Sequence, residues 1–321
     1  MGYDLIGDCH GQADMLEALL ACLGYRETGG LWHHPSRTAI FVGDLIDRGP
    51  QQLRTITIVR RMVEAGAALV VMGNHELNAI AWATPHPSGN GDYLRPHFEP
   101  QRGEKNRRQH ARFLEEVEHL PELYRDLIDW FMTMPLWLDL PELRVVHACW
   151  HPRFMAWLAP HLTAQRQLRP DLFAPATQEP ADEQERDSAE PSLFKAVEAI
   201  TKGIEVALPA PHCFRDKEGV ERHRVRVRWW DPGADEYVSA VLVDDTTRAG
   251  LPRAPIPDHA RIAPPTDKPI FFGHYWLTGV PRPLAPHAAC LDYSAGLGGP
   301  LVAYRWEGEV RLKDAQFVSV P

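Results

Sequence analysis

The chain has 321 residues, of which 44% are apolar and 24% charged, and its net charge is −9. This length predicts one or two domains with a sizeable core. No run approaches the roughly 18 apolar residues of a membrane span, and the polar start Met1–Asp4 is not a signal peptide. The negative charge argues against a general nucleic-acid binder. Five cysteines without a C-x-x-C pair favour a reduced, cytoplasmic setting.

Short apolar runs that end in glycine or polar residues predict buried strands. They lie at 3–7, 38–42, 67–72, 143–146, 270–272, 288–291 and 301–306. Helical spacing of apolar residues at 12–23 and 51–65 places helices between the first of these strands. The order strand, helix, strand predicts an α/β fold, in which ligands bind at the carboxyl ends of the strands.

The later part of the chain has weaker patterns. Residues 106–120 and 122–132 are expected to be helical, and 159–192, rich in Pro, Ala and acids, is expected to be a solvated, mobile loop. Residues 220–243 alternate on both sides of Asp231-Pro232-Gly233, which predicts a β-hairpin.

Polar residues at five of the expected strand ends form a set that suits metal ions. Each cluster by itself could be an ordinary turn, capped helix start or core histidine. Together they supply oxygen and imidazole nitrogen without thiolate, which favours Mn, Fe, Zn or Co over a structural zinc site. The candidate ligands are Asp8, His10, Asp44, Asn74, His147 and His274. A carboxylate between two metals holds them about 3.5–4 Å apart, where they activate water and neutralise a phosphate.

These motifs resemble the calcineurin-like metallophosphoesterases. The matching residues are Asp8-x-His10-Gly11, Gly43-Asp44-x-x-Asp47-Arg48-Gly49, Gly73-Asn74-His75-Glu76, His147 and Gly273-His274. The Asp-Arg-Gly and the Glu after Asn-His are similar to the phosphoprotein phosphatase branch, which includes symmetric dinucleoside tetraphosphatases. The resemblance implies a β-sandwich flanked by helices, with the metals at one edge. We expect one domain over 1–321 with helical cap and hairpin insertions at about 84–142 and 148–268.

The resemblance also implies a role for each matching residue. Asp8 and His10 would hold one metal, Asp44 would bridge, and Asn74, His147 and His274 would hold the other. His75 would protonate the leaving oxygen, Asp47 would orient His75, and Arg48 would grip the phosphate together with the Asn74 amide. The ions would be two divalent metals, with Mn first and Fe, Zn, Co or Ni as alternatives.

Two departures from the family pattern bear on the substrate. Gly273-His274-Tyr275-Trp276 lacks the second histidine that nucleases and phosphodiesterases of the superfamily have, which favours the phosphatase and tetraphosphatase branch. Ala148-Cys149-Trp150-His151 has a bulky residue where the family has small ones, so we expect Trp150 to reshape the pocket wall. His151 is either a substrate contact or an ordinary loop residue.

Weaker matches point to different substrates. Trp229-Trp230-Asp231-Pro232 is similar to a stretch of eukaryotic phosphoprotein phosphatases, and Leu291-Asp292-Tyr293 to tetraphosphatases. Arg224, Arg226 and Arg228 share one face of an expected strand by period two, and this face is either a second phosphate clamp or the solvated face of a hairpin.

We expect a phosphomonoesterase acting on a phosphoprotein or on a small phosphorylated metabolite or nucleotide. The alternatives are a symmetric dinucleoside tetraphosphate hydrolase and then a nucleic-acid phosphodiesterase that uses the basic run 102–112. We expect no membrane partner and no nucleic-acid partner.

Overall fold

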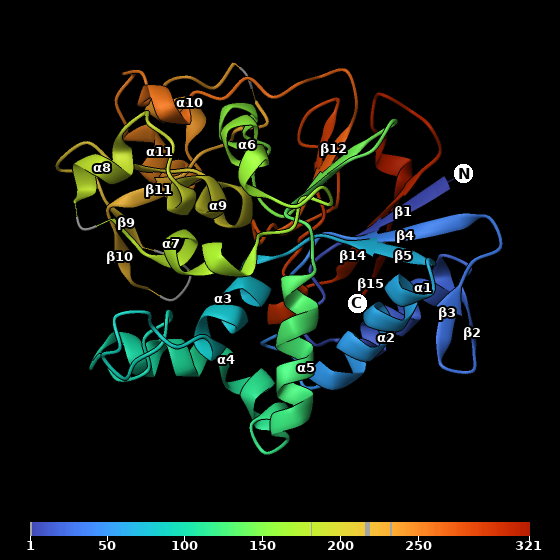
Figure 1. Cartoon of the computed structure of the whole chain (residues 1–321). Helices are drawn as coiled ribbons and strands as arrows, with labels where there is room; N and C mark the ends of the chain where they lie inside the picture. Colours follow the sequence, from blue (N-terminus) through green and yellow to red (C-terminus); the bar gives the residue numbers. More distant parts are fainter. Residues whose placement is uncertain (1, 181, 216–218, 232) are drawn as a thin grey trace.

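The computed structural model describes all residues except 1, 181, 216–218 and 232 (Figure 1). The strands are β1 (Gly2–Ile6), β2 (Arg26–Thr28), β3 (Leu31–His33), β4 (Arg37–Phe41), β5 (Ala68–Val70), β6 (Trp137–Asp139), β7 (Arg144–Val146), β8 (Glu205–Ala207), β9 (Phe214–Arg215), β10 (Glu221–Arg222), β11 (Arg224–Arg226), β12 (Ile270–Phe272), β13 (Ala288–Cys290), β14 (Leu301–Trp306) and β15 (Phe317–Val320). The α-helices are α1 (Ala13–Cys22), α2 (Gln52–Glu64), α3 (Asn74–Ala83), α4 (Arg102–Val117), α5 (Pro121–Met132), α6 (Pro152–Leu158), α7 (Phe173–Thr177), α8 (Glu183–Asp187), α9 (Leu193–Lys202), α10 (Tyr237–Ala240) and α11 (Asp245–Ala249).

Two mixed sheets form the centre of the molecule. The first has the order β15-β14-β1-β4-β5, in which β1, β4 and β5 are parallel, β14 is antiparallel to β1, and β15 is antiparallel to β14. The second has the order β13-β12-β7-β6, in which β12 is parallel to both β13 and β7. The parallel strands β1 and β4, and also β7 and β12, therefore bring their carboxyl ends to a common edge.

Alternate residues of these strands belong to two different hydrophobic clusters, as the period of two requires. One cluster contains Leu5, Ile40, Val145 and Phe271, with members from both sheets. The other contains the next residues along the chain, Ile6, Phe41, Val146 and Phe272, together with apolar side chains of the helices. The two sheets thus form a sandwich whose outer faces are covered by helices, and the protein has a mixed α/β fold.

The helices surround this sandwich in groups. Helix α1 packs against β14 and β15, and α2 packs against β5. Helix α3 packs against α5, and α4 against α2, below the sheets in Figure 1. Helices α6 to α11 gather in the upper left of that view.

The seven expected strands and four expected helices are confirmed, with ends shifted by up to four residues. Helix α3, which begins at Asn74, was not expected. The expected loop 159–192 contains the short helices η1 (Ala159–His161), η2 (Pro170–Leu172), α7 and α8. Its acid Asp187 is paired with Arg224, so this stretch is not simply solvated.

The expected hairpin at 220–243 is wrong. Strand β11 pairs with the earlier strand β8, in the register Arg224 to Ala207. The segment after the turn forms the short helix α10, and the backbone pairing of the two arms is limited, among the described residues, to the bridge between Val227 and Val241. Pro232 of the expected turn lies outside the described residues.

Candidate metal centre

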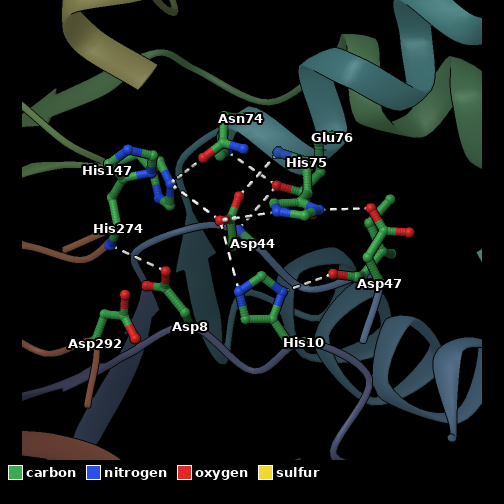
Figure 2. A network of polar contacts seen from close by, with 12 residues as sticks. Asp8, His10, Asp44, Asp47, Asn74, His75, Glu76, His147, His274 and Asp292 are labelled. Carbon is green, nitrogen blue, oxygen red and sulfur yellow. Dashed lines mark hydrogen bonds and ion pairs between the residues drawn. The ribbon is translucent and has the colours of Figure 1, made fainter. Parts of the chain in front are cut away.

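Residues after four strands converge in one buried cluster (Figure 2). Asp8 and His10 follow β1, Asp44 follows β4, His147 follows β7 and His274 follows β12. Each of these side chains is at most 4% exposed. The common edge of the parallel strands therefore gathers the candidate ligands, and Asn74 joins them from the start of α3.

The backbone at this edge adopts φ angles that are rare for residues other than glycine. Eight non-glycine residues among those described have a positive φ, a region that L-residues rarely adopt. Six of the eight lie in this cluster or beside it: His10, Asp44, Asp47, Arg48, His274 and Trp276. Such outliers cost free energy and persist where the surrounding structure enforces them, which is typical of functional sites.

Asp44 lies at the centre of the cluster. Its Oδ2 is 3.3 Å from His147 Nε2, 3.8 Å from His10 Nε2 and 3.9 Å from His75 Nε2. Potential ligand atoms lie within 4.8 Å of one another in two groups, His10–Asp44–His75 and Asp44–His147–His274. Asp44 belongs to both groups, which is the arrangement required of a carboxylate between two ions.

Several oxygen and nitrogen atoms of the cluster that could bind a metal are buried and have no hydrogen-bond partner among the described residues. They are Asp8 Oδ1, His10 Nε2, and Nδ1 and Nε2 of His274. Buried polar atoms are normally satisfied, so unpartnered lone pairs that converge indicate a missing cation. This donor set of carboxylate, amide and imidazole groups fits divalent metal ions.

Hydrogen bonds on the side away from Asp44 fix the ring orientation of two histidines. His10 Nδ1 lies 2.8 Å from the carbonyl oxygen of Ile46, and His147 Nδ1 lies 2.7 Å from that of Val42. Each Nδ1 is thereby the donor, which leaves Nε2 as the lone-pair atom that faces Asp44. Burial lowers the pKa of His10 to about 4, so its imidazole is neutral, the form that binds metals.

The ionisable groups of the cluster shift one another's pKa values. Burial alone would raise the pKa of Asp44, but the imidazoles of His147 and His75 outweigh it and hold that pKa well below its usual range. Burial and the neighbouring carboxylates Asp292 and Asp44 raise the pKa of Asp8. Cations at this position would relieve that repulsion.

Asp8 is oriented by the loop after β12. Its Oδ2 accepts a hydrogen bond from the His274 backbone N–H at 3.0 Å. A Cβ at Gly273 would lie 1.9 Å from Asp8 Oδ1, so only glycine lets this loop approach so closely. Asp292, which no sequence argument placed here, lies beside Asp8, and its carboxylate accepts hydrogen bonds from the Trp276 and Ser294 N–H groups.

Glu76 supports the loop that carries Asp44. Its carboxylate accepts the backbone N–H groups of Asp44 at 2.9 Å, Leu45 at 2.8 Å and Gly73 at 3.0 Å. Glu76 is fully buried. It therefore fixes the turn after β4 relative to the start of α3.

Glu76→Ala should destabilise the protein strongly. Each buried N–H left unsatisfied costs about 1–3 kcal/mol, so three should cost more than about 3 kcal/mol in the free energy of unfolding. Chemical denaturation measures this, with the exposed Glu115→Ala as a control that should change the free energy by less than about 0.5 kcal/mol. Equal stabilities of the two variants would contradict the role given to Glu76.

Asp47 lies between two histidines. Its Oδ2 is 2.5 Å from His75 Nδ1, and its Oδ1 is 2.9 Å from His110 Nδ1. Burial would raise the pKa of Asp47, but the His110 and His75 imidazoles outweigh it and lower that pKa. This arrangement directs His75 Nε2 away from Asp47. His110, which lies on α4, was not expected in the site.

A cavity of about 160 Å³ opens beside the cluster. The expected site residues that line it are Asp47, Arg48, Asn74, His75, Arg226 and His274. The residues that the sequence argument did not place there are Asn78, Arg95, Gln109, His110 and Trp276. The Arg48 guanidinium lies over the Trp276 ring, 4.7 Å from its centroid.

Other residues singled out in the sequence lie elsewhere. Arg228 is not among the described residues that line the cavity, and its guanidinium lies 3.4 Å from Asp231. His151 caps α6, where its Nδ1 accepts the Phe154 N–H at 3.3 Å. Trp150, expected in the pocket wall, packs instead under the Arg144 guanidinium at 5.4 Å.

Comparison with known proteins agrees with this site. Residues 2–155 match the family model described as calcineurin-like phosphoesterase. This segment, slightly less than half of the chain, therefore resembles the calcineurin-like phosphoesterases.

The chain is similar to two curated proteins named bis(5'-nucleosyl)-tetraphosphatase PrpE (asymmetrical). The protein of Halalkalibacterium halodurans is 47% identical over 76 residues, which are 23% of this chain and 31% of that protein. The protein of Bacillus subtilis (strain 168) is 43% identical over 76 residues, also 23% of this chain and 31% of that protein. The match thus spans less than a third of the length of these relatives.

Among solved structures, a putative diadenosine tetraphosphatase has a TM-score of 0.46 and 18% identity, with 100% of this chain and 93% of that chain covered. A cold-active protein-tyrosine phosphatase of a psychrophile Shewanella sp. has a TM-score of 0.49 and 15% identity, with 100% and 80% covered.

Proposed function

We propose that this protein is a hydrolase that cleaves phosphate esters with the help of two divalent metal ions. The observation that carries the proposal is the buried donor set around Asp44, which belongs to two groups of potential ligands at once. The family of residues 2–155 supports the same chemistry.

The proposed ligands share His10, Asp44, His147 and His274 with the two groups around Asp44, add Asp8 and Asn74, and leave His75 for proton transfer. Asp8, His10 and Asp44 would hold one ion, and Asp44, Asn74, His147 and His274 would hold the other. Manganese is our first choice, with Fe, Zn, Co or Ni as alternatives, because the donors are oxygen and imidazole nitrogen. When bound, such a pair supplies an activated water and neutralises phosphate charge.

The protein's own side chains would bind the substrate and move a proton. His75, whose Nδ1 faces Asp47, would present Nε2 to the leaving oxygen and protonate it. Asp47 would keep the ring in that orientation, with His110 on its other oxygen. Arg48 and the Asn74 amide would grip the phosphate, and Trp276 would hold the Arg48 guanidinium in place.

Two substrate classes fit this site. A phosphomonoester of a protein or a small metabolite is the first, because His274 is not followed by a further histidine ligand. A dinucleoside tetraphosphate is the second, favoured by the names of the curated relatives. A nucleic-acid phosphodiesterase ranks below both, since a chain of net charge −9 gains little from phosphate neutralisation outside the cavity.

One substrate panel tests the proposal. The purified protein, loaded with Mn²⁺, should hydrolyse p-nitrophenyl phosphate, a phosphopeptide or diadenosine tetraphosphate, and should leave bis-p-nitrophenyl phosphate largely intact. Chromatography of the products distinguishes symmetric from asymmetric cleavage of the tetraphosphate. Absence of hydrolysis with every substrate and every metal on the list above would refute the proposed function.

We further propose a single domain over 1–321, in which 84–142 and 148–268 form cap elements. One hydrophobic cluster with members from Ile6 to Val320 supports this assignment. Within the described residues, no helix is long and apolar enough to cross a membrane. A cytoplasmic location is our proposal, supported by five cysteines that are all free thiols.

Arg226 and Arg228 should differ in their effect on activity. Arg226 lines the cavity, so Arg226→Ala should lower kcat/KM for diadenosine tetraphosphate by roughly tenfold, the effect of one charge-assisted contact. Arg228→Ala should have the smaller effect, since its guanidinium lies beside Asp231. Steady-state kinetics measures both, and a larger loss for Arg228→Ala would contradict this assignment.

A further inference from the structure

Three guanidinium groups line the cavity beside the candidate metal centre. Arg48 follows β4, Arg226 ends β11, and Arg95 belongs to the segment between α3 and α4. Asp47 is the one acid among the described residues that line this cavity, and both of its oxygens are engaged by His75 and His110. A strongly cationic cavity in a chain of net charge −9 is a specific feature that indicates an anionic ligand.

The guanidinium of Arg95 is held in place but not saturated. Its Nη2 donates to Gln109 Oε1 at 2.7 Å, and its backbone N–H donates to the Ala81 carbonyl at 3.0 Å. Its Nε is buried without a hydrogen-bond partner among the described residues, as are those of Arg48 and Arg226. Because Arg95 also lines the cavity, the other N–H groups of its guanidinium can donate to an anionic ligand there.

The acids that face Arg95 are already engaged with other groups. The charges that act on it are Asp47, which is shared by His75 and His110, and Glu198 of α9. The Glu198 carboxylate lies 2.7 Å from Lys202 Nζ. Neither acid forms an ion pair with Arg95 among the described residues, so its charge remains available to an anion.

One phosphoryl group does not need all three guanidiniums. A phosphomonoester has three terminal oxygens, for which the metal ions and the fork of Arg48 compete. We propose that Arg95, positioned by Gln109, binds a second phosphoryl group next to the one that is hydrolysed. The preferred substrates then carry at least two neighbouring phosphates. This inference rests on the proposed function and selects among its substrate classes.

The test compares ligands that have one or two phosphoryl groups. Arg95→Met keeps the aliphatic stem and removes the charged fork. With Mn²⁺-loaded protein, we expect its inhibition constant for methylenediphosphonate to rise about 10- to 100-fold, while that for orthophosphate changes less than about threefold. The kcat/KM for diadenosine tetraphosphate should fall by a similar factor, and that for p-nitrophenyl phosphate should change less than about threefold.

Two further variants complete the experiment. Arg169→Met removes an exposed arginine that pairs with Asp171, and it should leave all four constants unchanged. Gln109→Ala should weaken methylenediphosphonate binding in the same direction but less, because Arg95 stays charged and loses only its anchor. If Arg95→Met lowers the thermal unfolding midpoint, Gln109→Ala still tests the inference, because it leaves Arg95 itself unchanged.

Each other outcome has a distinct meaning. Equal losses for one-phosphate and two-phosphate ligands would place Arg95 on the hydrolysed phosphate and overturn the inference. An Arg95→Met protein with unchanged constants would also overturn it. The substrate panel is measured first on the wild-type protein. If that protein hydrolyses no substrate of the panel, the proposed function itself is refuted.

Discussion

Asp44→Asn should remove most of the bound metal and almost all activity. The carboxylate lies between two groups of potential ligands, and an amide cannot offset the charge of two cations. Loss of a residue that merely orients a metal ligand typically costs 10- to 100-fold in metal affinity. Loss of the shared carboxylate should therefore cost more than about 100-fold, as elemental analysis and kcat/KM for p-nitrophenyl phosphate would measure.

The same variant should not unfold the protein. Asparagine keeps the size of the side chain and an Oδ1 that can accept the His75 backbone N–H, but it loses the favourable interaction of the carboxylate with the His147 and His75 imidazoles. Urea denaturation of metal-free protein should still show a cooperative transition for Asp44→Asn, with a somewhat lower midpoint than that of the wild type. Asp171→Asn, at an exposed position, serves as the control. Wild-type metal content in an active Asp44→Asn protein would refute the bridging role.

The metal cluster could be predicted because each ligand follows a buried strand. Runs such as 38–42 are apolar on both faces, and they end abruptly in polar residues, so their position in the sheet follows from the pattern alone. Parallel strands then bring these ends together. The meeting of His147 with Asp44 across two sheets was implied by the family resemblance and not by the strand pattern.

The rest of the cavity depends on contacts that no local pattern shows. His110 occupies a position of the buried face of α4, together with Phe113, Leu114 and Val117. A histidine at the spacing i, i+3, i+4, i+7 on an apolar stripe is a signal that could have identified it. Arg95 has no such signal, since its place is set by the fold of the segment 84–101 onto α3.

The failed hairpin has a tertiary cause as well. Alternation of Val225 and Val227 is real, and both side chains are buried. Strand β11 pairs with β8, whereas the second half of the expected hairpin becomes α10. Alternation fixes which residues share a face, but the partner strand depends on which edge is free in space.

His75→Ala should impair the hydrolysis of substrates with basic leaving groups most. A general acid typically contributes 10²- to 10⁴-fold when the leaving oxygen needs a proton. We therefore expect kcat for an alkyl phosphate to fall more than about 100-fold, while p-nitrophenyl phosphate, whose leaving group departs as a stable anion, loses far less. Steady-state kinetics with a series of aryl and alkyl phosphates measures the dependence on the leaving-group pKa.

The orientation of His75 gives a second, graded test. Asp47→Asn should show the same pattern in a milder form, because Asp47 contacts His75 Nδ1 at 2.5 Å and acts only through that ring. His110→Ala should be milder still, since it removes only the second contact of Asp47. Equal losses on aryl and alkyl phosphates in all three variants would mean that His75 positions the phosphate instead of donating a proton. A steeper dependence on leaving-group pKa in the order His110→Ala, Asp47→Asn, His75→Ala would establish the proton donor, because only a chain of residues that ends at the leaving oxygen produces that order.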